Sequence, residues 1–246
     1  MTTSIGAVII VVPVHNEAEL LERCLTALGH AVAETSLPCV VRIVLDACDD
    51  ESATIAAQHT FPLLALDANA VGAARAHGVA SALRALDGLN SLPPERIWIA
   101  GTDADSAVPA NWLTTQRELA DDGADVVLGS VRPDFDDLSE SHREHWLRTH
   151  THGAPNGNTH GANLGVRAST YISVGGFPSL PRDEDVQLVD ACRAAGAVVV
   201  ASDVAEVMTS GRLEGRAPGG YASFVREMAG HFAPERATTS PDGETR

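Results

Sequence analysis

Short apolar runs alternate with amphipathic stretches along the first 130 residues of the chain. Residues 7–12 are apolar and almost all β-branched, which is typical of a strand buried on both faces of a parallel sheet. After them, the apolar residues between Leu20 and Leu28 fall on one helical stripe, and Asn16 is in place to cap that helix. The same pattern predicts further strands at 40–45, 62–66, 97–100 and 125–129 and further helices at 50–59, 71–86 and 109–120. This alternation predicts an α/β fold with a doubly wound, mostly parallel, Rossmann-like sheet flanked by helices.

The regular alternation stops after residue 130. Residues 132–161 are polar and rich in His, Asp and Gly, and they contain one expected helix, at 137–150. Because irregular insertions often hold binding residues, we interpret this segment as a polar insertion that shapes a site. Regular elements return with a strand at 163–167, a turn at Gly175 and Gly176, a helix at 184–195 and a strand at 197–201. We expect a single domain over residues 1–232 and a disordered tail over 233–246, which is rich in Pro, Thr, Ser and Glu.

The amino-acid composition and net charge exclude several classes of function. Of the 246 residues, 44% are hydrophobic and 20% are charged, as in a globular soluble protein. The chain has 17 basic residues, all of them arginine, against 33 acidic ones, and the resulting net charge of −16 repels nucleic acids and anionic lipids. The four cysteines have no zinc-site or disulfide spacing, and the N-terminal apolar run is too short to span a membrane. We therefore expect a cytoplasmic protein with no nucleic-acid partner and no membrane span; a homo-oligomer is compatible with the sequence.

Polar residues follow three of the expected strands, at 13–17, 46–50 and 102–106. In an open α/β sheet, ligands bind at the carboxyl ends of the strands, so one ligand could contact all three segments. Asp103 and Asp105 are separated by one residue and can together hold a hard divalent cation that also binds a diphosphate. Such a tripeptide alone is more often a solvated turn, but its position after a buried strand favours a metal site. Asp46 could pair with a nucleobase, although its residue type and position favour a helix cap or a turn.

Through these and further motifs, the chain resembles the family 2 glycosyltransferases, which have the GT-A fold. The matching segments are 13–17 (PVHNE), Asp46, 69–75 (NAVGAAR), 102–105 (TDAD), 161–167 (GANLGVR), 175–177 (GGF) and 184–188 (EDVQL). Each motif is weak alone, but seven in the family's order over residues 6–228 make the resemblance specific. It implies a metal-dependent, inverting transfer of a sugar from a nucleoside diphosphate sugar to the hydroxyl group of an acceptor that the sequence does not identify.

The resemblance also implies roles for individual residues. The expected donor-binding residues are Pro13, His15, Glu17, Asp46, Asn69, Arg75, Asp103, Asn163, Arg212 and Arg216. Asp103 and Asp105 would bind Mn²⁺ or Mg²⁺, with His231 as a further metal ligand. In the acidic pair of Glu184 and Asp185, Asp185 would be the base that deprotonates the acceptor hydroxyl. By position alone, the macrodipole also favours acidic residues in the first turn of a helix.

Two further segments have open interpretations. Arg212 and Arg216 lie in a Gly-containing loop near the C-terminus. This loop would form a lid over the diphosphate; alternatively, the two arginines would pair with surface carboxylates. His150, His152 and His160 lack the spacing of a metal site, and we interpret them as acceptor-site or solvent-exposed residues.

Two other functions compete with sugar transfer. A nucleotidyltransferase needs a Gly-rich basic loop after the first strand, and residues 13–17 do not provide one. A non-catalytic nucleotide-sugar binding protein is the main alternative, since residues 47–50 depart from the family's pattern after the second strand and put a preference for uracil in doubt. Retention of both Asp105 and Asp185 favours the enzyme.

Overall fold

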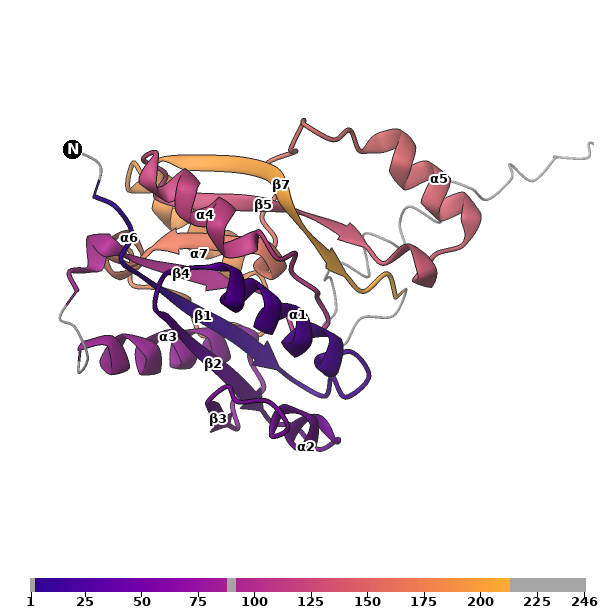
Figure 1. Ribbon diagram of the computed structural model, residues 1–246, viewed down its shortest axis with the longest axis horizontal. Coiled ribbons are helices and arrows are strands. Elements are labelled where there is room, and N and C mark those ends of the chain that lie inside the picture. The colour runs from indigo at the N-terminus through magenta and orange to yellow at the C-terminus, as the bar shows by residue number, and fades with distance from the viewer. Residues whose placement is uncertain (1–2, 88–91, 213–246) are drawn as a thin grey trace, which may run out of the picture.

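A mixed sheet forms the centre of the molecule (Figure 1). In residues 3–87 and 92–212, which the computed structural model describes, the sheet has seven strands in the order β3-β2-β1-β4-β6-β5-β7. The strands are β1 (Ala7–Val14), β2 (Cys39–Asp46), β3 (Leu63–Leu66), β4 (Ile97–Gly101), β5 (Val126–Pro133), β6 (Leu164–Arg167) and β7 (Val199–Thr209). β1 pairs in parallel with both β2 and β4, and seven of its eight residues are buried. The predicted α/β class and the buried first strand are therefore confirmed.

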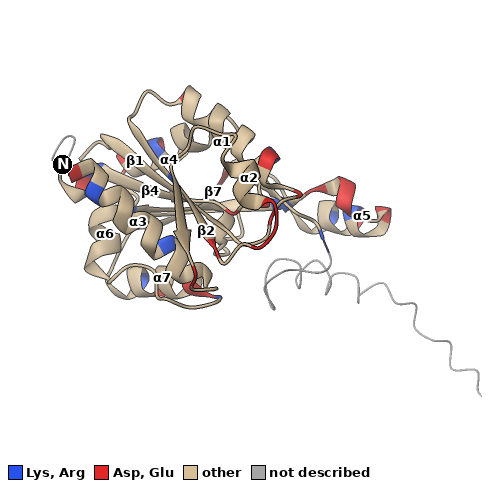
Figure 2. Ribbon diagram, turned by 90° about the horizontal axis from the view of Figure 1, so that it is seen from below, with Lys and Arg blue, Asp and Glu red and all other residues tan. Residues whose placement is uncertain are grey.

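Helices cover both faces of the sheet, and each face has its own apolar core. The helices are α1 (Leu21–Glu34), α2 (Ser52–Ala56), α3 (Val71–Asp87), α4 (Trp112–Asp121), α5 (Glu140–Thr149), α6 (Ala168–Ser173) and α7 (Glu184–Ala194), with short 3₁₀ turns at Pro94–Arg96, Phe135–Asp137 and Gly161–Asn163. Figure 2 shows α1, α2 and α4 on one side of the sheet and α3, α6 and α7 on the other, and residues of these two groups belong to separate buried clusters. The sheet is thus wound on both faces, as expected.

The second half of the sheet is less regular than the sequence pattern predicts. β6 is antiparallel to both of its neighbours, β4 and β5. β5 ends at the carboxyl edge of the sheet, and residues 134–163 connect it to β6 at the same edge. Because β6 begins at the edge where β5 ends, it runs in the opposite direction. β7 extends to Thr209, well past the predicted end at residue 201, and the short helix α6 is not predicted.

Asn16 does not cap the first helix. α1 begins at Leu21 and has no side-chain hydrogen bond at its N-cap. Asn16 instead has a left-handed backbone, with φ of +51°, and its side-chain oxygen accepts the backbone N–H of Asp49 at 2.9 Å. Its amide nitrogen donates to the Asp49 carboxylate at 2.6 Å. These contacts join the segment after β1 to the segment after β2, which places two of the predicted ligand-binding segments side by side.

The polar insertion projects from the body of the molecule (Figure 1). Ser139 caps its helix, α5, by accepting the backbone N–H of His142. Trp146 is 7% exposed and packs edge-on against Phe135, with ring centroids 5.3 Å apart, and stacks on His150 at 4.3 Å. The insertion therefore has a small aromatic core of its own. The predicted tail at 233–246 lies outside the described residues.

Candidate active site

A cavity of about 880 Å³ opens at the carboxyl edge of the sheet. Its walls come from the segments after β1, β2 and β4, as the sequence predicts, and also from α3, the start of α7, the end of β7 and the polar insertion. The predicted site residues that line it are Pro13, His15, Glu17, Asp46, Asn69, Arg75, Asp103, Asp105, Glu184, Asp185 and Arg212. The structure thus brings residues from both halves of the chain to one place.

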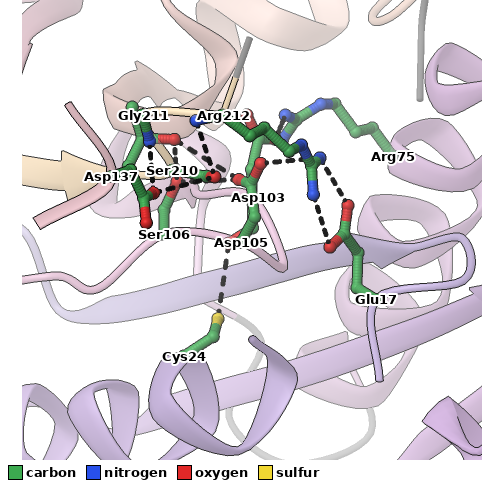
Figure 3. A network of polar contacts seen from close by, with 11 residues as sticks. Glu17, Cys24, Arg75, Asp103, Asp105, Ser106, Asp137, Ser210, Gly211 and Arg212 are labelled. Carbon is green, nitrogen blue, oxygen red and sulfur yellow. Dashed lines mark hydrogen bonds and ion pairs between the residues drawn. The ribbon is translucent and has the colours of Figure 1, made fainter. Parts of the chain in front are cut away.

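Arg75 on α3 links the two halves of the site (Figure 3). Its side chain is 2% exposed, its Nε donates to Glu184 Oε1 at 2.9 Å, and its Nη2 forms an ion pair with Asp103. The Phe177 ring lies 5.8 Å from the guanidinium carbon. Burial alone lowers the pKa of Arg75, but the negative charges of Asp103 and Glu184 outweigh it and raise that pKa. This buried cation therefore holds α3, the end of β4 and the start of α7 in a fixed arrangement.

Arg212 makes a second charged network at the cavity wall, next to that of Arg75 (Figure 3). Its guanidinium binds the Glu17 carboxylate through two hydrogen bonds, of 2.8 and 3.1 Å, and donates to Asp105 Oδ2 at 3.0 Å. Burial, followed by the charges of Asp103 and Glu17, raises the pKa of Asp105 to about 6, although Arg212 opposes this shift. Arg212 therefore offsets part of the repulsion among these crowded carboxylates.

Asp185 lies at the start of α7 beside the polar insertion. One of its oxygens, Oδ1, accepts the backbone N–H of Val186 at 2.8 Å. The other, Oδ2, would lie 3.3 Å from a Cβ atom placed on Gly161. Burial lowers the pKa of the neighbouring His160, and the negative charge of Asp185 opposes that shift. Asp185 therefore has one oxygen held by the backbone and one beside the insertion.

The Asp46 carboxylate organises the loop before α3. It is 3% exposed and accepts the backbone N–H groups of Ala68, Asn69 and Ala70 at 2.7 to 2.9 Å. Its backbone carbonyl lies 2.8 Å from Nδ1 of His15. Asp46 thus holds a loop 22 to 24 residues further along the chain and makes no cap for the helix α2 that follows it. Its pairing with a nucleobase stays a prediction.

Asn163 does not line the cavity. It is 2% exposed, and its Oδ1 accepts the indole N–H of Trp112 at 2.9 Å. Its Nδ2 donates to the carbonyls of Ser130 and Ala205, both at 2.9 Å. Both amide hydrogens are thus used inside the protein, which gives the Asn163 side chain a structural role, and its binding of the donor stays a prediction. Two other predicted site residues, Arg216 and His231, lie outside the described residues.

The sequence motifs did not single out several residues of the cavity. Asn156, Asn158 and Thr159 come from the polar insertion, and Arg182 and Asp183 precede α7. The polar composition of 132–161 indicated the region, but its irregular backbone gives no periodicity from which individual positions could be chosen. Among the described lining residues are seven carboxylic acids and three arginines, so the cavity is acidic.

Asp103 and Asp105, which follow β4, have the side chains to bind a divalent metal ion that is also bound to a diphosphate. In the described residues, no three His, Cys, Asp or Glu side chains are grouped so that they could hold a metal on their own. Asp103 and Asp105 nevertheless supply hard carboxylate oxygens at the cavity wall. Magnesium is usually bound by one or two carboxylates plus phosphate oxygens and water, and Asp103 and Asp105 would supply the carboxylates of such a ligand set.

Comparison with known proteins identifies the family. The family model "Glycosyl transferase family 2" matches residues 9–175, which is more than half of the chain. The chain belongs to this family. Among curated proteins, no match is found for this family 2 glycosyltransferase.

Solved structures share the fold. The Staphylococcus aureus protein TarS 1-349 in complex with UDP-GlcNAc is 14% identical with a TM-score of 0.58, over 86% of this chain and 60% of that one. The mannosyltransferase PcManGT from Pyrobaculum calidifontis, in complex with GDP-Man and Mn²⁺, is 20% identical with a TM-score of 0.57, over 94% and 71% of the two chains. This family 2 chain thus spans about 60% of the TarS fragment. No helix among its described residues has the length and apolarity to cross a membrane.

Proposed function

We propose that this protein transfers a sugar from a nucleoside diphosphate sugar to an acceptor hydroxyl, with inversion at the anomeric carbon and with Mn²⁺ or Mg²⁺ as cofactor. One observation carries the proposal: a single cavity holds the strand-end carboxylates Asp103 and Asp105 together with Asp185 of α7. A sugar transferase needs these two sets of groups, the first to hold a metal and a diphosphate, the second to accept a proton.

The segments after β1 and β2 are the proposed nucleotide end of the cavity. Pro13, His15 and Asp46 line it there, and three backbone N–H groups fix the Asp46 carboxylate. The solved structures of similar fold include one complex with UDP-GlcNAc and one with GDP-Man, so the fold accommodates either base. We therefore propose a nucleoside diphosphate sugar as donor and leave its base to experiment.

The charge of the cavity supports metal dependence. Seven carboxylic acids and three arginines among its described lining residues repel a free diphosphate. Asp103 and Asp105 would hold the metal ion, which when bound neutralises charge on the diphosphate leaving group. Arg75 and Arg212 fix the positions of these two carboxylates, so the metal-binding oxygens are preorganised.

The proposed base is Asp185. It takes the proton of the acceptor hydroxyl while that oxygen forms a bond to the anomeric carbon and the bond from this carbon to the diphosphate oxygen breaks. A single displacement of this kind inverts the configuration. Glu184, which is 4% exposed and bonded to Arg75, is a positioning residue, because its carboxylate fixes the start of α7.

A thermal-shift panel tests the donor site. UDP, GDP, ADP, CMP and dTDP are each added with and without Mn²⁺ to the wild type, to Asp105→Ala and to the control Asp190→Ala, whose residue is exposed on α7. We expect one nucleotide to raise the melting temperature in the presence of Mn²⁺, and we expect Asp105→Ala alone to lose this shift. The absence of any shift in the wild type would contradict the proposal.

A second variant separates catalysis from binding. Asp185→Asn keeps the size of the side chain but cannot accept the acceptor's proton. We expect it to retain the metal-dependent nucleotide shift and to lose sugar transfer by at least about a hundredfold, in line with the usual contribution of a general base. Unchanged turnover would exclude Asp185 as the base. Nucleotide binding without turnover in the wild type would favour the non-catalytic alternative.

A further inference from the structure

The polar insertion forms one wall of the cavity. Its last part, residues 150–160, is called the 150–160 loop here. Five side chains of this loop line the cavity: His150, Asn156, Asn158, Thr159 and His160. None of them is an acid or an arginine. This part of the wall therefore differs from the part that holds the charged networks of Arg75 and Arg212.

The loop is attached to the edge strand β7. The backbone N–H of Gly153 donates to the Asp203 carboxylate, and His152 Nδ1 lies 3.3 Å from the same carboxylate. The Asp203 side chain is 12% exposed. A Cβ atom on Gly157 would lie 4.0 Å from Ala201 Cβ, so the loop follows β7 before it turns back to the cavity. These contacts attach the loop to β7, although it contains no helix or strand.

The loop ends beside the proposed base. His160 directly precedes Gly161, and Asp185 Oδ2 would lie 3.3 Å from a Cβ atom placed there. A molecule bound at this end of the loop would therefore lie beside Asp185. None of the expected donor-binding residues belongs to the 150–160 loop, so the loop forms a separate part of the cavity wall.

We propose that the 150–160 loop is the acceptor subsite and that it selects an uncharged, polyhydroxylated acceptor, a glycoside. This inference rests on the proposed function. Asn amides present a donor and an acceptor side by side, and Thr and neutral His also donate and accept, which matches neighbouring hydroxyls of a sugar ring. A phosphorylated acceptor would meet no arginine of this loop, Arg182 at the cavity wall is paired with Asp183, and the net charge of −16 would repel the phosphate. Asn158 and His160 are the proposed specificity-determining residues.

Saturation-transfer NMR on the full chain tests the subsite without turnover. The protein is saturated with Mg²⁺, which is diamagnetic, and with UDP or GDP, whichever raises its melting temperature. The probes are methyl glucoside, methyl mannoside and methyl galactoside, with glucose 6-phosphate and farnesyl phosphate as charged counterparts. We expect at least one methyl glycoside to bind, and both phosphorylated probes to bind at least about tenfold more weakly. Stronger binding of either phosphorylated probe would overturn the proposal.

Two loop variants and a control identify the residues responsible. Asn158→Ala and His160→Gln are each expected to weaken methyl glycoside binding about tenfold, the loss of roughly one hydrogen bond, and to leave the nucleotide shift unchanged. Thr151→Ala is the matched control, because Thr151 is an exposed residue of the same loop that does not line the cavity. Unchanged glycoside binding in both loop variants, or no glycoside binding by a wild type that binds nucleotide, would overturn this inference alone. Loss of nucleotide binding in the wild type would overturn the proposed function itself.

Discussion

Arg75 carries its positive charge inside the protein, where two carboxylates neutralise it. Glu184 accepts from its Nε at 2.9 Å, and both side chains are at most 5% exposed. In Glu184→Gln, the amide oxygen can still accept this hydrogen bond, but the negative charge is lost. We expect the free energy of unfolding in urea to fall by about 2 kcal/mol, because the buried Arg75 loses one of the two negative charges that compensate it.

The same helix offers a control for this variant. Asp190 on α7 also pairs with an arginine, Arg193, but the two side chains are 64% and 46% exposed. Water screens such a pair, so Asp190→Asn should change the free energy of unfolding by less than about 0.5 kcal/mol. Equal effects of the two substitutions would show that the contact between Glu184 and Arg75 is not the structural link we describe.

His160 provides a pH prediction at the residue scale. Burial lowers its pKa below the usual value for a histidine, about 6.5, and the Asp185 charge opposes this shift. A histidine with a lowered folded-state pKa contributes stability above the unfolded-state pKa, and this contribution is lost as the pH falls through the folded-state pKa. The free energy of unfolding should therefore fall below about pH 6.5, and His160→Gln should weaken this dependence.

The titration of His160 can also be followed directly by NMR. Its ring signal, assigned with His160→Gln, should titrate below 6.5 in the wild type, and Asp185→Asn should lower the midpoint further because it removes a nearby negative charge. A midpoint that does not respond to Asp185→Asn would mean that the two side chains do not face each other.

The sequence indicated the candidate site unevenly, and particular residues show why. Asp103 and Asp105 could be predicted because they follow a buried strand, and topology places strand ends at one edge. Asn163 belongs to a matching motif, yet its hydrogen bonds to Trp112 and Ala205 depend on segments far apart in the chain. Asn158 lies in a loop whose path is set by contacts with β7, which no local pattern encodes.

At the scale of elements, the first half of the fold follows directly from apolar periodicity. β1, β2 and β4 are short apolar runs separated by helices, so their parallel pairing follows from the length of each crossover. The direction of β6 could not be predicted in this way. The direction depends on the edge of the sheet from which the chain returns after the polar insertion. The apolar pattern of a four-residue strand is the same for a parallel and an antiparallel orientation.

The packing of α3 against the segment before α7 gives a prediction at this scale. Gly72 donates its backbone N–H to the Leu180 carbonyl at 2.9 Å, and a Cβ atom on Gly72 would lie only 2.0 Å from the Pro178 carbonyl oxygen. Gly72→Ala should therefore separate the two segments and lower the free energy of unfolding by about 2 kcal/mol.

A second helical glycine gives the opposite expectation. A Cβ atom on Gly29 of α1 would have no atom within 4 Å. Gly29→Ala should raise the free energy of unfolding by about 0.5 to 1 kcal/mol, because alanine favours the helix and nothing obstructs it. Urea denaturation of both variants measures the difference. A Gly72→Ala protein as stable as the wild type would show that α3 does not pack as closely as described.

At the scale of the whole molecule, the net negative charge of the protein affects the binding of an anionic nucleotide. The net charge of −16 adds its long-range field to that of an acidic cavity. A nucleoside diphosphate is itself an anion, so both fields oppose its approach unless a metal ion accompanies it. Electrostatic repulsion from the protein as a whole is weakened by salt, whereas contacts inside the cavity are screened much less.

This difference gives a prediction about nucleotide binding in EDTA. The Debye length falls from about 30 Å at 0.01 M salt to about 8 Å at 0.15 M, so added NaCl should weaken the repulsion and strengthen the residual binding of UDP or GDP without metal. Isothermal titration at the two salt concentrations measures this, and the uncharged nucleosides uridine and guanosine serve as controls that should not respond. Weaker nucleotide binding at the higher salt concentration would instead mean that Arg75, Arg182 and Arg212 attract the diphosphate more strongly than the carboxylates repel it. In that case the arginines could bind the diphosphate without the metal ion.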